Sequence, residues 1–514
     1  MSVVRALPYD QLQLSRISVT AEQIDPLHHS GPTSPYFFAP PLAGVPSTVP
    51  DGCVVEQAAW LLRHGSRYPE PGSFTGWENL FARFQNATYT ARGPLSFIPF
   101  WTLPIDDEPH QPLFLSSTGA GEAFALGVKV RKRYGFTKGG ENITVRTAGQ
   151  QRVVDTATYF TRGYLSAGNY LTTPSLNRGT LIILPDSTTN TTFADSLTPS
   201  SSCPAYGVFS GNGSSTSDSF RSTFRQGIAD RLNGFLDGLV LDTTDIGVMQ
   251  DLCGFGFEVS GDHRFCDVFT ENEWLDYEYA HDLNYYYGSG PGNPLSATVG
   301  FPWLKAVTDL FEVGPGNTVK NGTLVPPPLI MGFTHDNNIP PLISALGLWN
   351  SSQTSPLPIT HRPPLPAREF RSSHLVSFPG NVAIERMSCV IGGPTSEQAM
   401  DKGVFHQANV LGGTVVNVNT TGTRKEEEVF IRVLANEAVI PIPSCRSGPG
   451  SSCSLDEFVG YVNGERKDVA GGFVERCGLE GVVDVEVGDE LLNRAVTYPS
   501  HGTAHFLHMI AQKY

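Results

Sequence analysis

Two short, mostly apolar runs in the chain lead directly into charged residues. Residues 53–62 run into Arg63-His64-Gly65, and residues 329–333 run into Thr334-His335-Asp336. Runs of this length and composition predict strands buried in a sheet. Loops at the carboxyl ends of such strands carry functional residues in many α/β proteins, so each run predicts a strand followed by a functional loop.

Helices are predicted at four places. Apolar residues recur every three or four positions in residues 153–164 and 224–239, which predicts helices with one buried face. Residues 121–134 end in three basic residues before Gly135, which is typical of a helix end. Residues 274–287 are a further helix candidate.

Loops and further strands are predicted around these helices. The Ser-, Thr- and Gly-rich residues 186–219 predict a loop, and the turn-forming residues within 1–50 predict an extended arm. Residues 142–147 predict a short strand, and residues 427–440 predict a hairpin that turns near Asn436. No internal repeat is visible.

The mixture of strand and helix signals predicts an α/β fold, in which helices flank a mixed sheet and a smaller, mainly α-helical domain is inserted. The expected units are an arm over 1–50, an α/β domain over 51–70, 136–165 and 296–514, and a mainly helical domain over 71–135 and 166–295.

Composition excludes two classes of partner. The formal net charge is −15 over 514 residues, and no basic stripe is visible, so nucleic acid is not an expected partner. The longest apolar runs are far shorter than the ~18 residues that cross a bilayer, so no membrane span is expected. Residues 1–10 lack the apolar run of a signal peptide, and a leader is not evident in this sequence.

Cysteines and sequons favour an oxidising, extracellular location. The cysteine count is 8, and no CxxC pair occurs, so zinc and thioredoxin-type sites have no support. Close pairs such as Cys253/Cys266 and Cys445/Cys453 suit short disulfide loops. Glycosylation sequons stand at Asn86, Asn142, Asn190, Asn212, Asn321, Asn350 and Asn419. The sequence therefore predicts a secreted glycoprotein with disulfides.

The first functional loop has the chemistry of a phosphate site. Residues 63–69 read RHGSRYP and place Arg63 and Arg67 on either side of His64. Arginine binds phosphate oxygens bidentately, and Gly65 lets the backbone approach an anion closely. A histidine flanked by guanidinium charges has a lowered pKa and can attack phosphorus as a neutral imidazole. The alternative, a basic surface turn, accounts poorly for five fixed positions.

These residues carry a family resemblance. RHGxRxP is the signature of the histidine acid phosphatases, and His335-Asp336 resembles the HD motif of their phytase and acid phosphatase branch. The resemblance covers most of the chain from about residue 53 and is to fungal phytases in particular. Similar segments are residues 274–294, 346–350, 376–389 and 432–453.

The resemblance implies roles for single residues. His64 is the nucleophile and Asp336 the proton donor, while Arg63, Arg67, Arg146 and His335 bind the phosphoryl group. The implied substrate is a small phosphate monoester, with neither metal nor cofactor, and the arginines supply the positive charge. The implied disulfides are Cys53/Cys389, Cys203/Cys477, Cys253/Cys266 and Cys445/Cys453.

The substrate preference stays open at this point. Fungal phytases often have paired lysines where this chain has Asn284-Tyr285, and no lysine precedes Lys129. Both differences favour a general acid phosphatase that also accepts phytate over a specialised 3-phytase. The remote alternatives are a phospho-ligand-binding glycoprotein without activity and a phosphomutase. Oligomeric state and the first inositol position cleaved are not determined by the sequence.

Three other signals are given less weight. His28-His29 and the group His501, His505 and His508 lack carboxylate or cysteine partners nearby, so they are not expected to bind a metal. The glycines of residues 288–292 follow a tyrosine-rich helix and not a strand, which favours a tight loop over a dinucleotide site.

Overall fold

The computed structural model describes residues 24–41, 44–136, 143–166, 179–184, 186, 197–317, 325–350, 356–365, 368–391 and 426–479. Its centre is a mixed sheet of eight strands in the order β10-β8-β7-β1-β6-β3-β4, with β9 paired to β8. The strands are β1 (Cys53–Arg63), β3 (Ile143–Ala148), β4 (Gly179–Leu184), β6 (Leu329–Thr334), β7 (Asn381–Ile391), β8 (Glu426–Ala435), β9 (Ala438–Val439) and β10 (Cys453–Ser454).

The direction of the strands changes at β1. On one side β6, β3 and β4 continue parallel to it, and on the other side each strand is antiparallel to its neighbour, β7 to β1 and β8 to β7. The predicted mixed sheet and the hairpin near Asn436 are thereby confirmed. β1 is buried along most of its length because it lies in the middle of the sheet.

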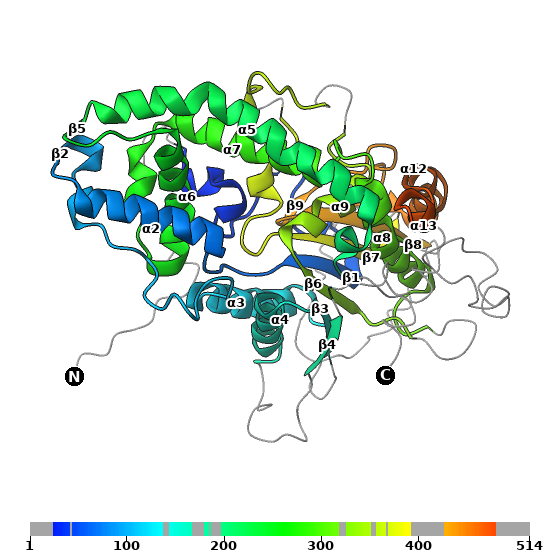
Figure 1. Cartoon of the computed structure of the whole chain (residues 1–514). Coiled ribbons are helices and arrows are strands. Elements are labelled where there is room, and N and C mark those ends of the chain that lie inside the picture. Colours follow the sequence, from blue (N-terminus) through cyan, green and yellow to red (C-terminus); the bar gives the residue numbers. More distant parts are fainter. Residues whose placement is uncertain are drawn as a thin grey trace, which may run out of the picture.

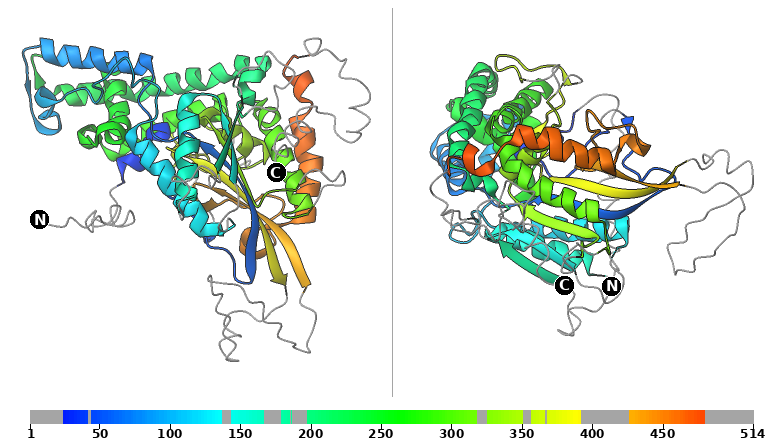
Figure 2. Two further views of the ribbon diagram at one scale, coloured as in Figure 1. Left: turned by 90° about the horizontal axis from the view of Figure 1, so that it is seen from below. Right: turned by 90° about the vertical axis from the view of Figure 1, so that its right-hand side faces the viewer.

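Helices cover the sheet and extend beyond it (Figure 1). α3 (Ser117–Tyr134) and α4 (Gln151–Tyr164) lie on one face, and α8 (Ser296–Val313) and α9 (Pro340–Ala345) lie on the other. The short helices α11, α12 and α13 (Leu455–Tyr461, Lys467–Ala470 and Phe473–Arg476) lie beside α8, as Figure 2 shows from two further sides.

A second group of helices lies at one end of the sheet. It contains α2 (Pro71–Asn86), α5 (Pro204–Asn233), α6 (Thr243–Ser260) and α7 (Glu271–Gly288), with the small strand pair β2 (Thr90–Ala91) and β5 (Leu236–Asp237). Its apolar residues form a cluster of their own, which includes Trp77, Trp101, Phe265 and Trp274. The expected domain boundaries stay a prediction.

The N-terminal half of α5 corrects the predicted loop over residues 186–219. Its serines bond back to the helix, as Ser210 Oγ does to the Gly207 carbonyl at 3.0 Å. Gly213 packs so closely on α7 that a Cβ there would lie 2.2 Å from the Asn284 carbonyl oxygen. Small residues thus allow α5 and α7 to touch, and this tertiary contact stabilises a helix that local composition argues against. The helix ends at Asn233, before the predicted residue 239.

Helices α2, α6 and α8 were not predicted. In α8 almost every residue is buried, so the helix has no polar face and therefore no amphipathic pattern. α6 does carry a local signal, because Asp242 and Asp245 form a capping box at its start.

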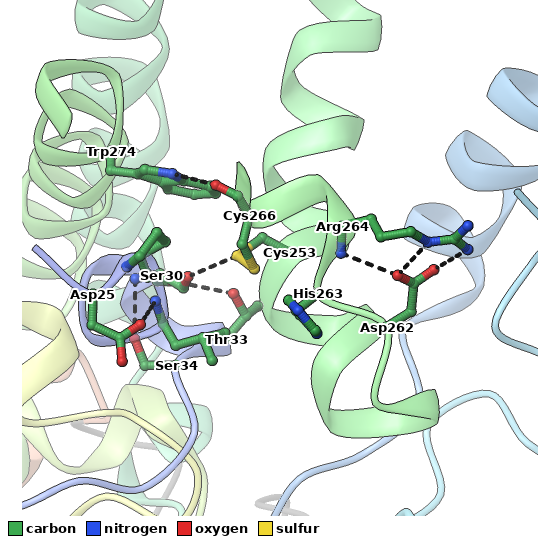
Figure 3. Close-up of a disulfide and its surroundings, with 12 residues drawn as sticks. Asp25, Ser30, Thr33, Ser34, Cys253, Asp262, His263, Arg264, Cys266 and Trp274 are labelled. Carbon is green, nitrogen blue, oxygen red and sulfur yellow. Dashed lines mark hydrogen bonds and ion pairs between the residues drawn. A yellow bond between two sulfur atoms is a disulfide. The ribbon is translucent and has the colours of Figure 1, made fainter. Parts of the chain in front are cut away.

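Four disulfides are present in the pairing that the resemblance implies: Cys53–Cys389, Cys203–Cys477, Cys253–Cys266 and Cys445–Cys453. The first two join segments far apart in the sequence, and the other two close short loops. The first joins β1 to β7 at positions that are direct partners in the sheet. Around the third, the indole of Trp274 donates to the Cys266 carbonyl at 3.0 Å, and Ser30 of the N-terminal arm lies against Cys253 (Figure 3). Within the described residues, no helix is both long and apolar enough to span a bilayer.

Candidate active site

The two functional loops meet because their strands are neighbours. β1 and β6 are parallel, and Arg63 is the register partner of Thr334. The backbone amide of His64 donates to the Thr334 carbonyl at 3.0 Å, and the ring centroids of His64 and His335 lie 5.6 Å apart. The parallel register therefore places the RHG and HD motifs side by side at one edge of the sheet.

The His64 ring is fixed in one tautomer. Its Nδ1 lies 2.9 Å from the Gly65 carbonyl oxygen, which can only accept a hydrogen bond, so Nδ1 carries the proton. Nε2 then has a free lone pair. Burial and the nearby charge of Arg63 hold the pKa of His64 well below its usual value, and the side chain is 1% exposed. Both effects favour the neutral imidazole, in which the Nε2 lone pair can act as a nucleophile.

Asp336 is held as a carboxylate. Its Oδ2 accepts from Arg63 Nη2 at 3.0 Å and from the Tyr285 hydroxyl at 2.8 Å, and its Oδ1 accepts from the Asn337 amide at 2.9 Å. Burial alone would raise the pKa of Asp336, but the Arg63 charge and the Tyr285 hydrogen bond lower it to about 2.

Arg63 is held in place by distant segments of the chain. It donates to the carbonyls of Pro32 in the arm and Val376 before β7, and its guanidinium stacks 3.9 Å from the Phe378 ring centroid. These contacts keep a buried cation in one orientation. Arg67 is also buried, with its Nη2 3.1 Å from Glu70.

A further arginine, Arg152, lies where Arg146 was expected. Arg152 stands in the first turn of α4, lines the same cavity as His64, and its Nη2 is 3.4 Å from His335 Nδ1. Burial and the Arg152 charge lower the pKa of His335 to about 4. Arg146 is buried within β3 and is not among the described residues that line the cavity, and its role in binding phosphate stays a prediction. Strand residues alternate between two faces, and the sequence does not say which face is the site.

The cavity has a volume of about 470 Å³. Its lining includes His64, Arg67, Arg152, His335 and Asp336. Neutral hydrogen-bonding residues form much of the remaining wall: Gln150, Thr198, Ser200, Ser201, Tyr206, Ser210, Asn284, Tyr285, Ser289, Asn337 and Asn338. Two carboxylates, Glu70 and Asp186, also line it, and no lysine occurs among its described lining residues.

Beneath the loop of residues 64–69 lie two carboxyl groups, of which Glu258 is buried and Glu122 partly buried. The Ser66 hydroxyl contacts Glu122 at 2.8 Å and also contacts Glu258. A hydroxyl has a single proton, so a proton on one carboxyl group is needed for both contacts to be hydrogen bonds. Burial raises the pKa of Glu258 to about 7, and burial together with the Glu258 charge raises that of Glu122.

The signals given less weight have structural explanations where they are described. His28 stacks on Phe37, and His29 contacts Glu278. His501, His505 and His508 lie outside the described residues. Cys445, Cys453 and Glu457 cluster as metal ligands would, but the two cysteines are joined in a disulfide and offer no thiolate.

Comparison with known proteins gives a consistent result. A model of the histidine phosphatase superfamily, branch 2, matches residues 54–436. A phytase of Candida albicans is 28% identical over 487 residues, covering 93% of this chain and 92% of that protein. An acid phosphatase of Komagataella pastoris is 28% identical over 469 residues, covering 90% of this chain and 88% of that protein.

The crystal structure of the phytase from D. castellii has the same fold, with a TM-score of 0.72, 24% identity and 92% coverage of both chains. The family model spans most of this chain and includes both loops that meet at the cavity. The chain therefore belongs to branch 2 of the histidine phosphatase superfamily.

Proposed function

We propose that this protein is a secreted acid phosphatase that hydrolyses phosphate monoesters through a phosphohistidine formed on His64. The observation that carries the proposal is the meeting of a neutral, tautomerically fixed His64 with Asp336 and a group of arginines. A protein that only binds phosphorylated ligands needs the arginines, but it needs neither the free Nε2 nor the carboxyl group.

In the first step, Nε2 of His64 attacks phosphorus and the bond between phosphorus and the alcohol oxygen breaks. Asp336 gives its proton to the departing oxygen. Arg63, Arg67, Arg152 and His335 bind the phosphoryl oxygens, with Arg152 in the role first assigned to Arg146. In the second step, water attacks phosphorus, the bond to Nε2 breaks, and Asp336 takes the proton of the water.

Substrate binding must change the protonation of Asp336. In the free protein the pKa of Asp336 is about 2. Burial raises this pKa, and the charge of Arg63 is the largest of the effects that lower it. A phosphoryl anion bound to the arginines offsets their positive charge and so raises the pKa of the carboxyl group. The acid form then becomes available at mildly acidic pH, and burial, which the anion does not offset, still lowers the pKa of His64.

The cavity wall favours small monoesters over phytate. Phytate carries many phosphates, and those outside the reacting position meet hydroxyl and amide groups together with Glu70 and Asp186. Both phytases and acid phosphatases are among the relatives, so phytate stays a candidate substrate and a specialised phytase the alternative.

Secretion is part of the proposal. Four disulfides are typical of an oxidising compartment. The sequon residues Asn86, Asn212 and Asn350 are exposed and accessible to glycosylation, while the remaining four sequons lie outside the described residues.

The covalent intermediate is the direct test. Rapid mixing with a ³²P-labelled aryl phosphate and quenching in alkali should leave label on the protein, and subsequent acid treatment should release it. His64→Ala should bind no label and release no phosphate. Label that survives acid, or turnover by His64→Ala, would contradict the mechanism. Release of all product phosphate to water in the presence of a second alcohol excludes a mutase.

A further inference from the structure

Tyr285 lies beside the Asp336 carboxyl group and shares its cavity. It stands in the last turn of α7, is 8% exposed, and donates its hydroxyl proton to Asp336 Oδ2 at 2.8 Å. The resemblance to fungal phytases drew attention to this position only because those proteins often carry a lysine there.

The Tyr285 side chain is carried by a rigid part of the fold. Its carbonyl accepts from the amides of Ser289 and Gly290 at 2.9 and 2.6 Å, which closes the end of α7. The next residues anchor the same turn: Tyr286 packs edge-on against Phe370, and the Tyr287 hydroxyl donates to the Leu357 carbonyl at 2.6 Å. The hydroxyl of Tyr285 is therefore presented to Asp336 from a fixed point.

Three groups orient the Asp336 carboxyl, and they differ in how strongly a bound phosphoryl group competes for them. The Asn337 amide holds Oδ1, while Arg63 and Tyr285 share Oδ2. Arg63 is also positioned to bind the phosphoryl group, so a bound substrate competes for its guanidinium. Tyr285 is neutral in acid and has little attraction for the phosphoryl charge, so its hydroxyl stays with the carboxyl.

We propose that Tyr285 is a positioning residue that orients the Asp336 carboxyl toward the leaving oxygen once the substrate has engaged Arg63. The inference rests on the proposed role of Asp336. It assigns Tyr285 no proton transfer, because the phenol keeps its own proton and Asp336 supplies the one that leaves. A lysine at this position would place an ammonium group against the carboxyl in place of a neutral donor.

The test compares Tyr285→Phe with Tyr287→Phe, which loses a hydroxyl from the same turn without touching Asp336. For glycerol 2-phosphate, whose alcohol needs a proton, kcat of Tyr285→Phe should fall about ten-fold or more, as expected for loss of one hydrogen bond to a charged group. For 4-nitrophenyl phosphate the fall should be several times smaller. Tyr287→Phe should change the ratio of the two rates by less than about two-fold.

The pH dependence of kcat distinguishes a positioning role of Tyr285 from a general loss of structure. The Tyr285 hydrogen bond lowers the pKa of Asp336, so its removal should move the falling limb of kcat for glycerol 2-phosphate to higher pH. Equal losses on both substrates, or an unmoved limb, would overturn the inference.

If Asp336→Asn is selective for the alkyl substrate and Tyr285→Phe is not, only this inference fails. If Asp336→Asn is itself unselective, the acid role of Asp336 in the proposed function fails, and this inference fails with it. In the Asp336→Asn background, Tyr285→Phe should cost nothing further on the alkyl substrate.

Discussion

Ser66 and Glu258 are hydrogen-bonded beneath the loop of residues 64–69 although they are 192 residues apart in the sequence. Glu122 on α3 contacts the same hydroxyl. Ser66 lies between His64 and Arg67, so this contact joins the loop that carries both groups to α3 and α6.

The carboxyl pair makes stability depend on pH. Burial raises the pKa of Glu258 to about 7, above the ~4.3 of an unfolded glutamate. The folded state binds more protons between these values, so the free energy of unfolding falls as pH rises from about 4.3 to 7. Glu258→Gln should remove roughly 2–4 kcal/mol of that fall, measured by urea unfolding at several pH values. The exposed Glu271→Gln is the control. If the free energy of unfolding depends on pH in the same way in wild type and Glu258→Gln, the raised pKa of Glu258 and the proton between the two carboxyl groups are contradicted.

Asp336→Asn should affect substrates according to their leaving group. An alcohol leaves only with a proton, whereas an acidic phenol leaves as its anion, so kcat should fall roughly 10²- to 10⁴-fold for glycerol 2-phosphate and much less for 4-nitrophenyl phosphate. Steady-state kinetics at the pH optimum provide the measurement. Losses of the same size on both substrates would remove Asp336 from the acid role.

Arg152→Gln should weaken phosphate binding. The guanidinium lies in the cavity beside His335, and its loss removes a charge-assisted contact to the phosphoryl group. The inhibition constant for inorganic phosphate should rise about ten-fold or more. Arg162→Gln, an exposed change on the same helix, should leave it unaltered. An unchanged inhibition constant in Arg152→Gln would show that Arg152 does not bind the phosphoryl group.

Asn284→Lys should improve the use of phytate. A lysine in the cavity wall attracts the phosphates outside the reacting position, so KM for phytate should fall at low ionic strength and return toward the wild-type value in salt. KM for 4-nitrophenyl phosphate should hardly change. Tyr285 is kept, because its hydroxyl binds Asp336.

Gln226→Lys provides the control for charge alone. Gln226 is exposed on α5 and lies about 24 Å along that helix from Ser210 in the cavity wall. If Gln226→Lys lowers KM for phytate as much as Asn284→Lys does, the effect comes from net charge and not from the cavity.

The sequence by itself determined two neighbouring strands of the sheet, β1 and β6, and the loops that follow them. The apolar runs of β1 and β6 and the motifs that follow them are local signals, which need no knowledge of distant residues. The spacing of apolar residues in α4 was sufficient for the same reason.

Tertiary structure alone decided the rest. Which arginine enters the cavity depends on the face of β3 and the start of α4, so Arg152 and not Arg146 lines it. The contact of Tyr285 with Asp336 depends on how α7 docks at the end of β6. The first half of α5 is helical because Gly213 allows close packing on α7. Each of these depends on contacts between residues far apart in the chain, and local patterns carry no record of them.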